Sequence, residues 1–236
     1  MANDNTLVFT IAMNGYQWLY RRHIQSQRRY ALRHGYDYVA VSRPGVTRLG
    51  VECCWLKILL LKHALMAGYQ RVLFVDADAY INPNAPALDV ITHDRPDASV
   101  FMAKGYSGQF NSGVVLVTHC EASLAFLHDV MHANPPENAF QGKVGWGEND
   151  QVIACSQGQT CIAILDPRWN NTFDIRLQDF IRHYNHGPLR TSLPLRLIHK
   201  SLSRLSRLLA KLDPLPHQHQ LAALFRQVQR QYPHFY

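Results

Sequence analysis

The feature that most constrains this sequence is a short apolar run that ends in two aspartates. Residues 72–75 read Val-Leu-Phe-Val, and Asp76, Ala77 and Asp78 follow directly. A continuous apolar run of this length is typical of a strand covered on both faces, as in a parallel sheet between helices. Such a strand delivers both carboxylates to its carboxyl end, where α/β folds bind their ligands. If the chain turns at Ala77, both oxygens can hold one hard cation.

A plainer interpretation is that Asp76 and Asp78 only form a turn before Pro83. An unpaired carboxylate directly after so apolar a run is costly, however. We therefore favour a bound cation.

Strand and helix signals alternate along most of the chain. We expect strands at Thr6–Met13, Tyr36–Val41, Arg71–Val75, Ser99–Ala103, Gly113–Thr118 and Cys161–Leu165. We expect helices at Tyr16–His34, Cys53–Ala67, Glu121–Ala133 and Glu148–Ser156, with Gly35 and Gly68 as stop signals. This alternation predicts a single α/β domain over residues 1–190, with a doubly wound, mostly parallel sheet.

The character of the chain changes after residue 190. Leucine and isoleucine recur at helical spacing in Leu193–Leu212, and five basic residues lie between them. We expect residues 191–236 to form a basic amphipathic helical extension. Such a helix either packs its leucines on the preceding α/β domain or binds an anionic membrane surface, and we favour the membrane.

The bulk composition fits a folded protein with an anionic partner. The 236 residues are 47% hydrophobic and 17% charged, with a formal charge of +7. The five cysteines show no paired spacing, and no segment reaches the ~18 apolar residues of a membrane span. The apolar stretch near the N-terminus follows Asp4 rather than a basic region, so it does not read as a signal peptide. We expect a cytoplasmic protein, peripheral on the inner face of the membrane.

The aspartate pair resembles the Asp-x-Asp motif of GT-A glycosyltransferases, including the glycogenin-like and lipooligosaccharide galactosyltransferase families. Other segments resemble motifs of the retaining α-galactosyl-, α-mannosyl- and xyloglucan xylosyltransferases, in the same order. These segments are Ser26–Asp37, Phe110–Cys120, Glu148–Gln151, Asp166–Asn170 and His183–Pro188. The resemblance spans about residues 6 to 190.

The resemblance implies a GT-A fold and a metal-dependent hexosyl transfer. The donor would be a nucleotide-diphosphate sugar, with uridine diphosphate favoured, and the cation Mn²⁺ or Mg²⁺. The acceptor would be a hydroxyl of a glycan or glycolipid, attacked with retention of configuration. The leaving diphosphate would serve as the base.

The third metal ligand implied by the resemblance is His183 or His186. The family motif is one residue shorter than His-Tyr-Asn-His-Gly-Pro at residues 183–188, so both histidines stay candidates, with a slight preference for His183. The Lys-Pro-Trp expected after it is absent, and Arg190 stands where that lysine would contact the diphosphate.

Further residues are assigned to the donor sugar nucleotide. By residue type alone, residues 111–113 read as an ordinary Asn-Ser-Gly turn. The resemblance implies instead that Asn111 holds a sugar hydroxyl and that Gly113 allows close approach of the backbone. Lys57, on the helix before the Asp-x-Asp strand, either reaches a phosphate or is an ordinary solvated residue. The donor-binding set is Thr10, Ala12, Lys57, Asp76, Ala77, Asn111, Ser112, Gly113, Gly187 and Arg190.

The acidic segment Glu148–Gln151 opens a predicted helix, so capping and the helix dipole explain it equally well. In the families that it resembles, a group in this region lies beneath the anomeric carbon. We therefore assign Glu148, Asp150 and Gln151 as the catalytic candidates.

Three other functions share some of these sequence features. A nucleotidyltransferase would show a glycine-rich phosphate loop near the first strand, where only Gly15 occurs. A nucleic-acid-binding module would interleave basic and aromatic residues on one patch, whereas the basic residues here lie mainly on two predicted helices. A catalytically silent nucleotide-sugar binder shares every ligand residue and stays open.

Overall fold

The computed structural model describes residues 5–47, 53–132, 148–185 and 217–236, together with residues 189, 197, 198 and 201. Its centre is a six-stranded sheet in the order β2-β1-β3-β6-β5-β7. The strands are β1 (Thr6–Ile11), β2 (Asp37–Val41), β3 (Arg71–Val75), β5 (Val100–Lys104), β6 (Phe110–Thr118) and β7 (Ile162–Ile164). A separate two-stranded sheet pairs β4 (Ala79–Ile81) with β8 (Ile181–His183).

One strand of the central sheet runs against the others. β1 is parallel to β2 and β3, and β5 is parallel to β7. β6 is antiparallel to both of its neighbours, β3 and β5. A short turn with Gly108 in the left-handed region (φ 75°) joins β5 to β6, and so short a connection permits only an antiparallel pair. The expected mostly parallel α/β sheet is confirmed.

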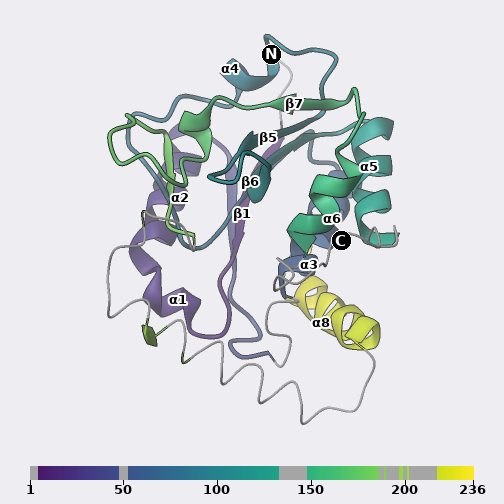
Figure 1. Ribbon diagram of the computed structural model, residues 1–236. Helices are drawn as coiled ribbons and strands as arrows, with labels where there is room; N and C mark the ends of the chain where they lie inside the picture. Colours follow the sequence, from purple (N-terminus) through teal and green to yellow (C-terminus); the bar gives the residue numbers. More distant parts are fainter. Residues whose placement is uncertain are drawn as a thin grey trace.

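Helices cover both faces of this sheet (Figure 1). They are α1 (Tyr16–Leu19), α2 (Arg21–His34), α3 (Cys53–Met66), α4 (Asp89–Thr92), α5 (Glu121–His132), α6 (Glu148–Cys155) and α8 (His217–Gln231), with 3-10 turns at Pro167–Trp169 and Pro233–Phe235. Alternate residues of β1 enter different cores: Leu7 and Phe9 pack on the α3, α5 and α8 side, and Val8 on the α2 side. This alternation follows from the two-residue period of a strand.

The helix predicted over Tyr16–His34 is in fact two helices. Tyr20 leaves helical geometry (φ −108°, ψ 24°) between α1 and α2. Its ring is 2% exposed and packs with Ala12 and Ala77 beneath the end of β3. Burial of this tyrosine explains the break, since a straight helix would carry its side chain elsewhere. Gly35 ends α2 in the left-handed conformation, as predicted.

Helix α8 lies within the segment 191–236, where the sequence predicts a helical extension without giving this helix its own bounds. It buries Leu221, Leu224 and Val228 in the core beside α3, while Phe235 packs edge-on against Phe9. Of the helix predicted at Leu193–Leu212, only residues 197, 198 and 201 are described, so that prediction lies largely outside the described residues. None of the helices that the structure describes combines the length and apolar character needed to cross a bilayer.

Candidate metal and donor site

The turn expected at Ala77 is present. Asp76 directly follows β3, and its backbone N–H donates to the Gly113 carbonyl on β6 at 2.7 Å. The Ala79 N–H closes the turn by donating to the Asp76 carbonyl at 2.9 Å. Asp76 and Asp78 therefore leave the carboxyl end of the buried strand within one tight turn.

The inner face of α2 supports this turn. The buried Gln27 amide donates to the carbonyls of Asp76 (3.0 Å) and Ala79 (2.9 Å), which bracket Ala77 and Asp78. Tyr38 donates to the Gln27 carbonyl oxygen at 3.2 Å and so fixes the amide orientation. Sequence reasoning missed Gln27 as a site residue, although it lies within the segment Ser26–Asp37 that carried the resemblance.

His183 reaches the turn through the small sheet. β4 and β8 pair so that Ala79 lies opposite His183. The His183 Nε2 is 3.2 Å from Asp78 Oδ1 and 3.5 Å from Asp76 Oδ2. One ligand atom from each of these three residues lies within 4.8 Å of the other two, which is the spacing of a shared cation. His186, the other candidate, lies outside the described residues.

Asn170 sets the orientation of the His183 ring. The Asn170 Nδ2 donates to Asn111 Oδ1 at 2.9 Å and to the Asn111 carbonyl at 3.1 Å. The Asn170 Oδ1 therefore faces the His183 Nδ1, 2.9 Å away, and accepts its proton. This tautomer leaves a lone pair on Nε2, the nitrogen that faces the two carboxylates.

Gly113 provides the room for the cluster. A Cβ at this position would lie 2.1 Å from the His183 Cε1 and 2.7 Å from the Asp76 Oδ2. No real side chain tolerates such distances, so the backbone of β6 passes directly under the candidate ligands. The requirement for glycine here is one of space, because no positive φ is involved.

The electrostatics of the cluster suit a cation. Enclosure by protein raises the pKa of Asp76 to about 6, and the neighbouring Asp78 and Glu148 carboxylates add to the rise. Burial alone would lower the pKa of His183, but Asp78 and Asp76 outweigh it and raise that pKa. The Asp76 side chain is still 36% exposed, so the cluster opens to solvent on that side. Two carboxylates and an imidazole suit a divalent ion such as Mn²⁺.

Lys57 is buried beside the site. Its amine donates to the Ser112 carbonyl (2.9 Å) and hydroxyl (3.0 Å) and forms an ion pair with Glu148. The interpretation of Lys57 as a solvated helix residue is wrong, since its side chain is only 4% exposed. Burial alone would lower the pKa of Lys57, but the Glu148 and Asp76 carboxylates hold it above its usual range.

The three catalytic candidates on α6 have different surroundings. Glu148 accepts from the Ser112 hydroxyl at 2.8 Å through Oε1, while its buried Oε2 lacks a hydrogen-bond partner among the described residues. The Gln151 amide donates to Cys155 Sγ, one turn along the helix, at 3.8 Å. Asp150 is half-buried. Asn149, which we did not assign, accepts from the Ser112 N–H at 2.8 Å and so fixes α6 to the start of β6.

The remaining donor candidates include Thr10, Ala12, Gly187 and Arg190. Thr10 and Ala12 are fully buried at the end of β1, and the Thr10 hydroxyl has no partner among the described residues. Gly187 and Arg190 lie outside the described residues. The structure therefore brings together Asp76, Asp78, His183, Asn111, Ser112, Gly113, Lys57 and Glu148 at one edge of the sheet.

Comparison with known proteins finds similarity in structure only. No protein-family model matches the sequence, and no curated protein matches it. A glycosyltransferase involved in the glycosylation of the major capsid of PBCV-1 is similar over 84% of this chain and 99% of its own, at 18% identity and a TM-score of 0.57. The glycosyltransferase GlyE of Streptococcus pneumoniae TIGR4 is similar over 95% of this chain and 64% of its own, at 13% identity and a TM-score of 0.51. The chain therefore has the fold of these glycosyltransferases.

Proposed function

We propose that this protein transfers a hexose from a nucleotide-diphosphate sugar, with uridine diphosphate favoured, to a hydroxyl of a glycan or glycolipid. The observation that carries the proposal is the convergence of Asp76, Asp78 and His183 at the carboxyl end of a central strand. The shared fold with known glycosyltransferases supports it.

In this proposal the three converging residues hold a divalent cation, Mn²⁺ or Mg²⁺. When bound, the cation supplies Lewis-acid stabilisation of the negative charge on the leaving diphosphate. Asn170 keeps the His183 ring in its ligating tautomer, and Gln27 keeps the turn that carries both aspartates. Arg190, and Lys57 if it exchanges its present partners, would add positive charge on the phosphate side.

The donor sugar lies, in this proposal, over the segment Asn111–Gly113. The side-chain oxygen of Asn111, Oδ1, accepts hydrogen bonds from the Gly113 N–H and from the Asn170 amide. The side-chain amide hydrogens of Asn111 can therefore donate to a sugar hydroxyl. Ala77 and Gly187 are further candidates for the donor side, while Thr10 and Ala12 are fully buried and would support that side only from beneath. Glu148, Asp150 and Gln151 approach from α6, and the unpartnered Oε2 of Glu148 is free to accept a hydrogen bond.

The proposed reaction retains the anomeric configuration. A bond forms between the acceptor oxygen and the anomeric carbon, and the bond from that carbon to the diphosphate oxygen breaks. The acceptor proton leaves to the departing diphosphate, so no protein base is consumed. This step requires that water be kept from the anomeric carbon, because hydrolysis would compete.

The test is donor cleavage across a panel of nucleotide-sugars, with Mn²⁺, with Mg²⁺ and with EDTA. Metal-dependent release of a nucleotide diphosphate from one donor, lost in Asp78→Ala and retained in Asp129→Ala, is expected. Metal-dependent binding without release, even with glycan and glycolipid acceptors, would favour the silent binder. No binding of any donor would refute the proposal.

A further inference from the structure

The outer face of α2 is a strongly basic surface on the helix that supports the metal-binding turn. Residues 5–36 include five arginines and no lysine, aspartate or glutamate. Four of these arginines, Arg21, Arg22, Arg28 and Arg29, are exposed, and none forms an ion pair with a described residue. Because 100° separates successive residues, all four lie within one side of the helix. We call them the α2 arginine face.

Two exposed apolar side chains lie on α1 and α2, the helices that begin and carry this basic segment. Trp18 on α1 is 70% exposed, and Leu32 near the end of α2 is 67% exposed. The opposite side of α2 is buried, with Gln27, Tyr30 and Ala31 inside the protein. Leu32 on α2 and Trp18 on α1 therefore take no part in the packing of these helices against the core.

We infer that the α2 arginine face, with Trp18 and Leu32, docks on an anionic lipid bilayer. Arginines near such a surface are attracted by its negative potential, and tryptophan is favoured at the boundary between headgroups and acyl chains. A single exposed aromatic among four arginines suits a flat lipid surface better than a single-stranded nucleic acid, whose successive bases stack on several aromatics. The inference goes beyond the proposed transfer and does not depend on turnover.

The sequence between residues 186 and 216 is also basic. Residues 186–216 contain six basic residues and a single acidic one, Asp213. By charge alone this segment is a poor partner for the arginine face, which favours an anionic partner from outside the chain. The membrane contact that the sequence suggested for Leu193–Leu212 is thereby assigned to a second, structured surface.

Docking through α2 would set the position of the metal site. Gln27 on the buried side bonds to both ends of the Asp76–Ala79 turn. The arginine face is on the other side of the same helix, about 10 Å across. Helix α1, which carries Trp18 in its sequence, follows the carboxyl end of β1 (Figure 1). An acceptor carried on a lipid would then be held at a fixed distance from the site.

The test is co-sedimentation with vesicles of phosphatidylcholine alone and of phosphatidylcholine mixed with phosphatidylglycerol, without donor. Binding only to the mixed vesicles is expected. Each basic residue contributes roughly fivefold to partitioning, so Arg28→Gln/Arg29→Gln should weaken it by roughly twentyfold. Arg226→Gln/Arg230→Gln, a matched pair exposed on α8, should leave it unchanged.

Brominated phosphatidylcholine in the mixed vesicles tests the apolar contact. It should quench part of the tryptophan fluorescence, and Trp18→Phe should abolish that quenching while the other three tryptophans remain. Unaltered circular dichroism of the variants excludes unfolding. Equal loss in both arginine pairs, loss only in Arg204→Gln/Arg207→Gln, or tighter binding of RNA than of the vesicles would each overturn the inference.

Discussion

Two clusters of histidine and aspartate within the described part of the chain differ in how their side chains are held. The first is Asp76, Asp78 and His183, whose ligand atoms lie within 4.8 Å of one another. The second lines a cavity of about 390 Å³ between α5 and α6, formed by His128, Asp129, His132, Cys155 and Gln159. By residue type alone, the second cluster offers more metal ligands than the first.

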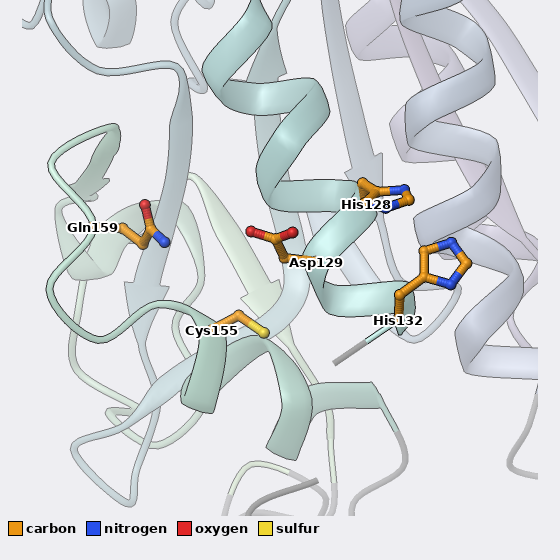
Figure 2. A pocket seen from close by; sticks show the side chains of 5 residues that line it. All are labelled: His128, Asp129, His132, Cys155 and Gln159. Carbon is orange, nitrogen blue, oxygen red and sulfur yellow. The ribbon is translucent and has the colours of Figure 1, made fainter. Parts of the chain in front are cut away.

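Figure 2 shows why the second cluster does not form a comparable site. His128 and His132 project to one side of α5, while Asp129 projects to the other, the side on which Cys155 and Gln159 lie. Neighbouring residues on a helix diverge by 100°, so His128 and Asp129 cannot converge. In the first cluster the ligands come from a turn and from a strand paired beside it. Convergence therefore required two chain segments far apart in sequence.

The largest effect expected is loss of an aspartate ligand. Asp78→Ala should reduce metal-dependent donor cleavage by about a thousandfold, since Lewis-acid stabilisation is worth several kcal/mol. Asp129→Ala in the second cluster should leave the rate unchanged. Steady-state release of nucleotide diphosphate measures both, and equal rates for the two variants would remove the distinction between the clusters.

Adding a methyl group beneath the first cluster should weaken metal binding, with the second-largest effect expected. Gly113→Ala would force the His183 ring and the Asp76 carboxylate apart, since the new Cβ would lie 2.1 Å from the His183 Cε1. We expect Mn²⁺ affinity, measured by calorimetry, to fall by about a hundredfold. Gly45→Ala is the control, because its nearest neighbouring atom would be 3.8 Å away. Unchanged Mn²⁺ affinity in Gly113→Ala would contradict the assigned ligands.

The orientation of the histidine can be tested separately. Asn170→Ala removes the acceptor for His183 Nδ1 and should weaken Mn²⁺ binding by about ten- to a hundredfold. Lys62→Ala removes the corresponding neighbour of His128, 3.5 Å from its Nδ1, and should have no effect. If both variants bind Mn²⁺ as the unmodified protein does, the tautomer is not set by Asn170.

Gln27 should affect metal binding indirectly, because it supports the turn that carries the two aspartates and is not itself a candidate ligand. Gln27→Leu removes its hydrogen bonds to the carbonyls of Asp76 and Ala79 and should lower the free energy of unfolding by about 1–3 kcal/mol. Mn²⁺ affinity should fall by about fivefold in the same variant. Gln25→Leu, exposed on the same helix, is the control for both measurements. A stability loss with unaltered Mn²⁺ affinity would limit Gln27 to a structural role.

The smallest effect expected is on the pH dependence of stability. In the metal-free protein the pKa of Asp76 is raised from 3.8 to about 6, so the folded state holds a proton that the unfolded state has lost. Stability should therefore fall as pH rises from about 4 to about 6. The raised pKa of His183 extends this fall above 6.5. Added Mn²⁺ should raise Tm increasingly over this range; a Tm increment independent of pH would contradict the assignment.

Much of the fold was readable from local sequence patterns. Each strand and helix predicted before residue 190 is present within a few residues, and β3 matches at both ends. The exception, the break at Tyr20, depends on burial of that ring beside Ala12 and Ala77. Helix α8 lies within residues 191–236, where a helical extension was expected, but its own bounds were not predicted.

The candidate site was likewise predicted only in part from local sequence patterns. The sequence by itself determined that two carboxylates leave the end of a buried strand, because an apolar run followed by Asp-x-Asp is a local signal. Only the tertiary structure brought His183 to them, through the pairing of β8 with β4. It also turned Lys57 inward to Glu148 and aligned Asn170 behind His183. Contacts across so many residues depend on how strands pair and helices pack, and neither is encoded in the periodicity of a single segment.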